Sequence, residues 1–349
     1  MKQKLLALVE AAINCKKPAL SGTIDWQEIY ALAAQQGVLA LVFDAVATLP
    51  VEQQPSKALK MQWIASVANI ERRYNHHKSA ATELAEHFHK NDIKTYVLKG
   101  FAIAEYYPRP EHRECGDLDC FLGEGYERGN CVAEALGAKV MRDYYKHSHI
   151  TYRKLMVENH QFCVGIRGSS GLKEFERHLE SIISRDAAYI EDTKLIKPSA
   201  DFNALFLTSH AMTHFLVEGI KLRHICDWAL LLKHEQNNIE WDSFYRWTDR
   251  LGYTRFANIL TDIAVNQLGV EITNPYIRRD GEYSAPLMKD MFEANAIFNK
   301  GLSAWRVRLS TVVSRVGSMW KFHKVYRRSV LGHICRQAWG YLFERKPKL

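Results

Sequence analysis

The stretch that decides the fold is YVLKGFAIAEYYPRPEHRECGDLDCFL, residues 96–122. It opens with a short apolar run that stops at Gly100, and it closes with a second apolar run that contains Asp117 and Asp119. Aspartate is a poor strand former, and burying its charge costs free energy unless a partner compensates for it. The two aspartates therefore raise the question of which partner completes them.

Asp117 and Asp119 lie in the segment GDLDCFL, residues 116–122, whose alternation predicts a strand. Side chains two residues apart in a strand point to the same face, so these carboxylates are expected to lie close together. Like charges this close repel, and one pKa rises unless a cation lies between them. Magnesium is the natural cation, because it is held by one or two carboxylates together with substrate phosphates. The alternative is an ordinary surface strand.

The turn at Lys99 and Gly100 lies upstream, between a predicted buried strand (94–100) and a short predicted helix (101–107). Backbone N–H groups at such a turn can hold phosphates, and Lys99 adds positive charge to the same anion. Arg113 could do so from the connecting loop. The alternative is an ordinary turn with a solvated lysine.

A two-metal site usually needs a third carboxylate from a neighbouring strand. Residues 149–166 contain two short alternating runs that predict a hairpin, and Glu158 lies on the second of them. His160 is expected on the same face as Glu158. Asp143 is the second choice, because its surroundings are more polar.

The wider pattern predicts an α+β protein with a mixed sheet core between helical regions. Apolar residues at three- and four-residue spacing predict helices before residue 93, with a break at Gly37 and one long helix over 57–93. The four predicted regions are an N-terminal helical region (1–93), the sheet core (94–198), a C-terminal helical domain (199–300) and a basic helical tail (301–349).

Composition is that of an ordinary soluble globular protein, with 349 residues, 47% hydrophobic and 25% charged. No apolar run reaches the roughly 18 residues that a membrane span needs. The N-terminus predicts an amphipathic helix and not a signal peptide. Seven cysteines without a CxxC pair argue against structural zinc or disulfides, and they favour a cytoplasmic location.

The net charge of +8 is concentrated at the C-terminus. From residue 300 onward there are twelve Lys or Arg and one Glu, so this segment carries +11 and the remainder −3. Such a tail can bind nucleic acid, an acidic partner or an anionic membrane surface, which would make the protein membrane-peripheral. The alternative is a solvated helical face.

The segment HAMTHFLVEGIKLRHICDWALLL, residues 210–232, predicts two helices joined near Gly219. His210 and His214 share one face at i and i+4; this spacing suits zinc, but no third ligand is evident, so core or capping roles are favoured. Arg223 and Asp227 have the same spacing. They are expected either to pair within the helix or to face the nucleotide cleft.

These motifs together resemble a known family. Leu98-Lys99-Gly100, Tyr107-Pro108, Arg113 and Gly116-Asp117-Leu118-Asp119 are similar to the nucleotidyltransferase-like family often found in bacterial polysaccharide gene clusters, within the polymerase-β-type superfamily. VENHQF (157–162), residues 210–232 and LAAQQGVLALVFDAV (32–46) extend the resemblance over about residues 26–241. The family has Lys-Gly where the wider superfamily prefers Gly-Ser or Gly-Gly.

The resemblance implies a metal-dependent transferase that moves an NMP group from an NTP donor to an acceptor hydroxyl. Asp117, Asp119 and Glu158 would hold two Mg²⁺ ions, with Mn²⁺ as the alternative metal. The implied nucleotide-binding residues are Lys99, Gly100, Arg113, Gly116, Arg223 and Asp227. A sugar or glycan is the favoured acceptor, RNA or tRNA the second choice, and a protein the third.

Two other functions fit the same residues. One is a catalytically inactive nucleotide-binding module whose helices serve as a partner surface; the presence of Glu158 favours catalysis over it. The other is the nucleotidyltransferase toxin of a toxin–antitoxin pair, which would arrest growth on expression unless Asp117 or Asp119 is replaced.

Overall fold

The computed structural model describes residues 1–167, 169–297 and 319–326. Within them, one seven-stranded sheet has the strand order β3-β4-β5-β2-β1-β7-β6. The strands are β1 (Thr95–Val97), β2 (Leu118–Phe121), β3 (Lys139–Met141), β4 (His147–Tyr152), β5 (Leu155–His160), β6 (Ala188–Tyr189) and β7 (Leu195–Lys197). The pairs β2–β5 and β1–β7 are parallel and the other pairs are antiparallel. The predicted α+β class with a mixed sheet is confirmed.

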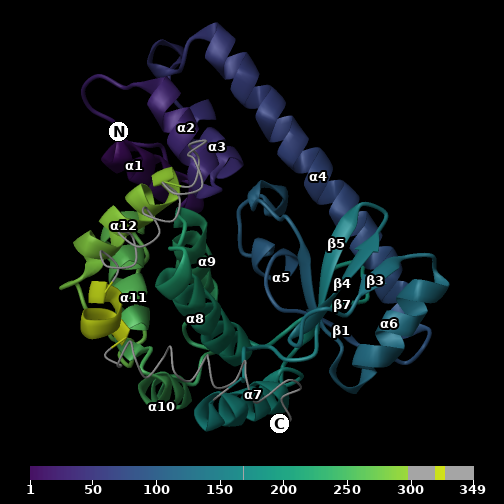
Figure 1. Cartoon of the computed structure of the whole chain (residues 1–349). Helices are drawn as coiled ribbons and strands as arrows, with labels where there is room; N and C mark the ends of the chain where they lie inside the picture. The colour runs from purple at the N-terminus through teal and green to yellow at the C-terminus, as the bar shows by residue number, and fades with distance from the viewer. Residues whose placement is uncertain (168, 298–318, 327–349) are drawn as a thin grey trace, which may run out of the picture.

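Helices surround the sheet and form a second body beside it, as Figure 1 shows. The α-helices are α1 (Lys2–Ile13), α2 (Trp26–Gln36), α3 (Leu39–Ala47), α4 (Lys57–His89), α5 (Phe101–Ala104), α6 (Tyr126–Ala135), α7 (Ser170–Ile182), α8 (Ala200–Val217), α9 (Leu222–Glu235), α10 (Trp241–Leu251), α11 (Thr254–Leu268) and α12 (Ser284–Ile297). Short helical turns are η1 (Val51–Gln53), η2 (Pro110–His112), η3 (Gly123–Gly125) and η4 (Lys321–Tyr326).

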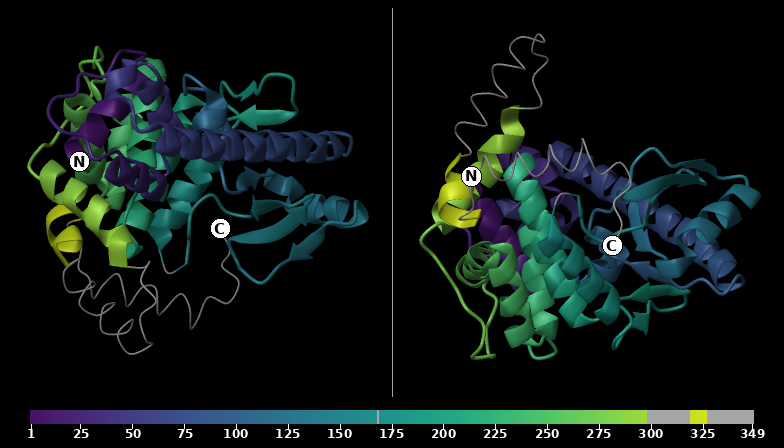
Figure 2. Two further views of the ribbon diagram at one scale, coloured as in Figure 1. Left: turned by 90° about the horizontal axis from the view of Figure 1, so that it is seen from above. Right: turned by 60° about the horizontal axis from the view of Figure 1, so that its bottom comes forward.

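Local sequence explains where the N-terminal helices begin and end. The Asp25 side chain accepts a hydrogen bond from the backbone N–H of Glu28 and caps α2, while Gly37 ends that helix with φ 68°. Ser56 caps α4 in the same way. The predicted break at Gly37 and the predicted long helix are therefore confirmed. In both views of Figure 2, α4 reaches from the helical body to the sheet.

The sheet packs one face against α4 and α6. Leu118 and Cys120 of β2 belong to the hydrophobic cluster on that side. Asp119 lies between them in the strand, so its side chain points to the opposite face. The predicted strand over 116–122 is shorter in the structure, since β2 begins at Leu118. Asp117 therefore lies in the turn before the strand and not within it, which corrects the prediction.

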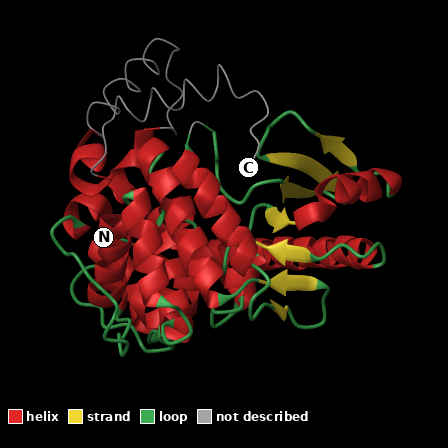
Figure 3. Cartoon of the chain, turned by 90° about the horizontal axis from the view of Figure 1, so that it is seen from below, coloured by secondary structure: helices red, strands yellow, loops and turns green. Residues whose placement is uncertain are grey.

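The helices at the two ends of the chain share a second hydrophobic cluster. Members of α1 and α3 pack with members of α8, α9 and α11. Figure 3 shows these helices gathered at one end of the molecule and the strands at the other. No helix within the described ranges has both the length and the apolar character to cross a membrane.

A short C-terminal segment, residues 319–326, packs on the helical body. The Lys321 ammonium donates a hydrogen bond to the backbone oxygen of Phe215 at 2.9 Å and pairs with Asp290 at 2.8 Å. The rest of the predicted basic tail, residues 301–349, lies outside the described residues, so its predicted partners stay predictions.

Candidate functional site

The parallel pairing of β2 and β5 brings two acidic residues side by side. Asp119 and Glu158 are Cα partners in this register, so their side chains leave the same face of the sheet on neighbouring strands. Asp119 is buried, and the Glu158 side chain is 26% exposed. A pairing one residue out of register would turn one of the two carboxylates to the other face of the sheet.

Asp119 is held between two cationic or donor groups. Lys99 Nζ lies 3.1 Å from its Oδ2, and His160 Nε2 lies 3.2 Å from its Oδ1. Burial alone would raise the pKa of Asp119, but the Lys99 ammonium and the His160 hydrogen bond hold it well below its usual value. His160 Nε2 also lies 3.4 Å from Oε2 of Glu158. His160 therefore bridges the two carboxylates, from the face on which the sequence predicts it.

Asp117 lies beside this group but not within it. Burial, followed by the Asp119 charge, raises the pKa of the Asp117 carboxyl. One set of metal-ligating atoms on the sheet is Asp119, Glu158 and His160, all within 4.8 Å of one another, and a second is His147, His149 and Glu158; neither includes Asp117. Asp143, the second choice for the third carboxylate, is 70% exposed and contacts His149 instead.

A cleft lies between the segments that follow β1 and precede β2 on one side and the helices α8 and α9 on the other. Its sheet side carries Asp117 and Asp119, and its helical side carries His210 and His224. The six predicted nucleotide-binding residues all line this cleft: Lys99, Gly100, Arg113, Gly116, Arg223 and Asp227. The fold therefore brings together residues that lie more than a hundred positions apart in the chain.

The Lys99-Gly100 turn depends on a backbone conformation that favours glycine. Gly100 has φ 61° and ψ −114° and precedes α5. The backbone N–H of Leu98 donates to the backbone oxygen of Asp119 at 3.0 Å, which ties the start of this turn to β2. The turn therefore directs Lys99 to the Asp119 carboxylate.

Arg113 is engaged in a buried ion pair. Its Nε and Nη2 donate to the two carboxylate oxygens of Asp227 at 3.0 and 2.8 Å, and the Tyr107 hydroxyl donates to Asp227 at 2.8 Å. Burial opposes the charge on Asp227, yet Arg113 lowers its pKa. The Asp227 carboxylate therefore forms its ion pair with Arg113, and not with Arg223, the partner predicted within the helix.

Arg223 instead reaches across to the segment before the aspartates. Its Nη1 donates to the backbone oxygen of Glu114 at 2.9 Å. Together with the Arg113–Asp227 pair, this bond fixes α9 against the loop that precedes β2. Arg223 and Asp227 both face the cleft, as one of the two sequence interpretations expects.

Sequence reasoning missed two side chains near the carboxylates, Lys146 and His224. Lys146, just before β4, is largely buried; burial lowers its pKa, while Asp119 and Glu158 act in the opposite direction. His224 joins His210 and His214 in a three-histidine group, and His210 and His224 line the cleft. No local sequence pattern identifies Lys146 as a site residue. The only sequence indication for His224 is that it directly follows Arg223.

The loop after β5 is anchored by a buried carboxyl on α7. Glu176 accepts hydrogen bonds from the backbone N–H groups of Cys163 at 2.6 Å and Val164 at 2.8 Å. Burial raises the pKa of Glu176 to about 7. This anchor fixes the chain just beyond Glu158 and His160.

We expect Glu176→Gln to lower the free energy of unfolding by about 1–3 kcal/mol, because its amide NH₂ faces a backbone N–H and leaves that donor unsatisfied. Urea denaturation measures the change. Glu191→Gln, which changes an exposed carboxylate in the turn between β6 and β7, is the control and should stay within about 0.5 kcal/mol of wild type.

The pH dependence of Glu176 gives a second readout of the same variant. Because folding raises the pKa of this carboxyl to about 7, the native state binds its proton more tightly than the unfolded state. Its contribution to stability therefore decreases as the pH rises to about 7, and the Gln variant should lack this decrease. Identical pH dependence in the two proteins would contradict the assignment.

Comparison with known proteins identifies a family for this chain. The profile of a family described as "Uncharacterised nucleotidyltransferase" matches residues 22–269, well over half of the chain. The matched residues contain all seven strands and the whole lining of the cleft. No curated protein and no solved structure shows significant similarity to the chain. The chain therefore belongs to this family of uncharacterised nucleotidyltransferases.

Proposed function

We propose that the protein transfers an NMP group from an NTP to an acceptor hydroxyl, with Mg²⁺ held by Asp117, Asp119 and Glu158. The observation that carries this proposal is the register of β2 and β5, which places Asp119 beside Glu158 and next to Lys99. Nucleotidyl transfer needs carboxylates for metal ions and cations for phosphates within one cleft. The family assignment supports the same reaction class.

The donor atoms present suit magnesium. Asp119 Oδ2 is buried and makes no hydrogen bond to any described residue, although Lys99 Nζ lies 3.1 Å away. Burial, followed by the Asp119 charge, raises the pKa of Asp117, and a bound cation would offset both effects. Carboxylate oxygens are the ligands that Mg²⁺ prefers, and Mn²⁺ accepts the same set. When bound, the metal would offset phosphate charge and lower the pKa of the acceptor hydroxyl.

The chain's own groups would bind and orient the substrate. The Lys99 side chain is 20% exposed, so its ammonium can contact a phosphate while it stays paired with Asp119. The Gly100 turn presents backbone to the same cleft, and Arg223 faces it from α9. His160 fixes the orientation of the carboxylates of Asp119 and Glu158 through its contacts of 3.2 and 3.4 Å. Catalysis would then rest on positioning and charge.

We expect Lys99→Met to weaken Mg²⁺–NTP binding by about 10- to 100-fold, since a hydrogen bond to a charged group contributes about 1.5–3 kcal/mol. Calorimetric titration with each of the four NTPs measures the affinity. Lys94→Met removes an exposed lysine just before β1 and serves as the control. Unchanged affinity in Lys99→Met would contradict the proposed phosphate contact.

The choice of acceptor and the two alternative functions, an inactive nucleotide-binding module and a toxin, rest on the family resemblance. A sugar or glycan hydroxyl is the first acceptor to screen and RNA the second. A catalytically inactive module would bind NTP without releasing pyrophosphate, and a toxin would arrest growth on expression. The same NTP titrations, followed by a pyrophosphate assay, separate these functions.

A further inference from the structure

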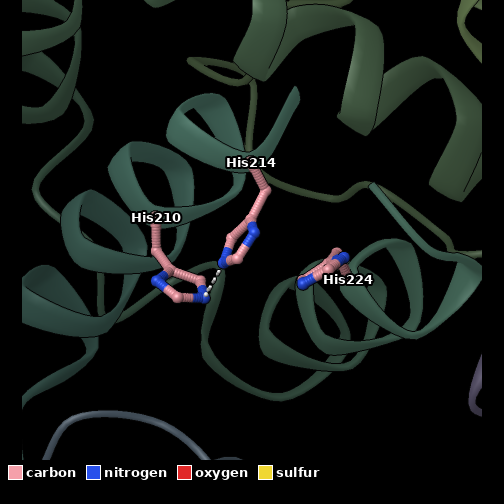
Figure 4. A group of neighbouring side chains, drawn as sticks. All are labelled: His210, His214 and His224. Carbon is pink, nitrogen blue, oxygen red and sulfur yellow. Dashed lines mark hydrogen bonds between the residues drawn. The ribbon is translucent and has the colours of Figure 1, made fainter. Parts of the chain in front are cut away.

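Three histidines form a cluster on the helical side of the cleft. His210 and His214 lie at i and i+4 on α8, and His224 lies at the start of α9. Figure 4 shows the three rings turned toward one another, with His210 Nε2 and His214 Nε2 joined at 3.1 Å. His210 and His224 line the same cleft as the carboxylates Asp117 and Asp119.

The hydrogen-bond partners determine which ring nitrogens carry protons. The backbone N–H of Lys221 donates to His224 Nδ1 at 2.9 Å, so the proton of the neutral His224 ring is on Nε2. His214 Nδ1 contacts the carboxylate of Glu218, so it is the donor there, and in the neutral ring His214 Nε2 then has a lone pair.

The position of the proton on the His210 ring follows from that on His214. Because His214 Nε2 has the lone pair, His210 Nε2 carries the proton of their shared hydrogen bond. His210 Nδ1 then has a lone pair and makes no hydrogen bond to any residue in the described part of the chain. Figure 4 shows this nitrogen on the side of the ring away from His214.

The same protonation pattern argues against a zinc site. The three histidines have ring nitrogens within 4.8 Å of one another, which would suit a metal ion. However, Nε2 of His224 is protonated while Nδ1 accepts the backbone N–H, so this ring offers a donor and no lone pair. Two ligands remain, and zinc sites in proteins use three or four.

Charged groups face His210 from both sides of the cleft. They are Lys99 and Asp119 from the sheet, His214 on the same helix and His224 on α9. Burial, followed by the Lys99 charge, lowers the pKa of His210 well below its usual value. A neutral ring can accept a proton but retains it poorly, so it needs a second group to take the proton onward. His214 and then Glu218, whose side chain is 59% exposed, provide that route to solvent.

We propose that His210 is the general base that takes the proton of the acceptor hydroxyl, and that His214 and Glu218 pass this proton to solvent. The inference rests on the proposed nucleotidyl transfer and places the acceptor between Asp119 and α8. The hydroxyl oxygen bonds to the α-phosphorus, and the bond from that phosphorus to the bridging oxygen breaks, its electron pair leaving with pyrophosphate.

The protons would move along the hydrogen bonds that join His210, His214 and Glu218. The hydroxyl proton goes to His210 Nδ1, the Nε2 proton of His210 passes to His214 Nε2, and the Nδ1 proton of His214 passes to Glu218. One proton enters the chain and one leaves it, so no ring has to hold a net charge after the step. The three groups act in sequence, and only His210 touches the substrate.

Pyrophosphate release from Mg²⁺–NTP, with water as the acceptor hydroxyl, tests the inference. His210→Ala is expected to lower kcat by about 10²–10⁴-fold, the usual contribution of a general base. Its stabilisation by Mg²⁺–NTP should be unchanged, and added imidazole should restore part of the rate. His214→Ala is expected to lower kcat without changing KM for the nucleotide. His89→Ala, an exposed histidine at the end of α4, is the control.

A second measurement does not depend on turnover. Long-range ¹⁵N NMR of histidine-labelled full-length protein should show Nε2–H in His210 and His224 and Nδ1–H in His214. A wild-type kcat in His210→Ala, other tautomers, or stoichiometric Zn²⁺ binding that His210→Ala abolishes would each overturn the inference. If wild-type protein is not stabilised by any Mg²⁺–NTP, the proposed function itself fails; if it is stabilised but His210→Ala keeps the wild-type rate, only this inference fails.

Discussion

Asp117→Asn is expected to release pyrophosphate at least about a thousandfold more slowly than wild type, because loss of a metal-binding carboxylate removes several kcal/mol of transition-state stabilisation. Without nucleotide, the same variant should unfold at a higher temperature than wild type. Folding raises the pKa of Asp117, through burial and the Asp119 charge, so its ionised form destabilises the native state at neutral pH. Differential scanning calorimetry of the apo protein measures this gain.

Asp119→Asn should be equally inactive but should unfold at a lower temperature than wild type. Lys99 and His160 lower the pKa of Asp119 against the effect of burial. Its carboxylate therefore contributes stability above the unfolded-state pKa, and this contribution is lost as the pH falls through the folded value. The same Asp→Asn change two residues apart should thus shift stability in opposite directions. Shifts of the same sign would contradict this account of the electrostatics.

Asp227→Ala is expected to lower the free energy of unfolding by about 3–5 kcal/mol, because it leaves the Arg113 charge buried without its partner. The pair is nearly inaccessible, with side chains 6% and 4% exposed, and Tyr107 loses its acceptor as well. Urea denaturation measures the loss. Asp242→Ala, an exposed aspartate in the first turn of α10, is the control and should cost less than about 1 kcal/mol.

The double variant Arg113→Met/Asp227→Leu tests whether the instability of Asp227→Ala comes from the unpaired Arg113 charge. Replacing both charges with apolar groups of similar volume is often neutral in stability. We expect the double variant to recover most of the stability that Asp227→Ala loses. A double variant as unstable as Asp227→Ala would contradict the unpaired Arg113 charge as the cause of the loss.

Local patterns were sufficient to predict most of the elements. The hairpin of β4 and β5 follows from alternation, and the α2–α3 break follows from Gly37, which adopts a positive φ. These patterns depend only on residues that are close in sequence, so they predict local structure without knowledge of the tertiary fold. The placement of Glu158 and His160 on one face was predictable for the same reason, because strand periodicity fixes it.

Contacts between segments that are far apart in the chain could not be predicted from local sequence patterns. Arg113 and Asp227 are 114 residues apart, and neither has a feature that identifies the other as its partner. His224 completes the histidine cluster only because the turn between α8 and α9 folds it back onto His214. Asp117 falls outside β2, since hydrogen bonding with β5 begins at Leu118. Tertiary packing decides all three features.

Thermal unfolding of wild-type protein with each NTP, with and without Mg²⁺, tests the central claim most directly. A ligand at a hundred times its dissociation constant adds about 2.7 kcal/mol to the stability of the native state. We predict a Mg²⁺-dependent rise in melting temperature with at least one NTP, and its loss in Asp117→Asn. The absence of a shift with every NTP, or a shift that Asp117→Asn retains, would contradict a metal–nucleotide site at these carboxylates.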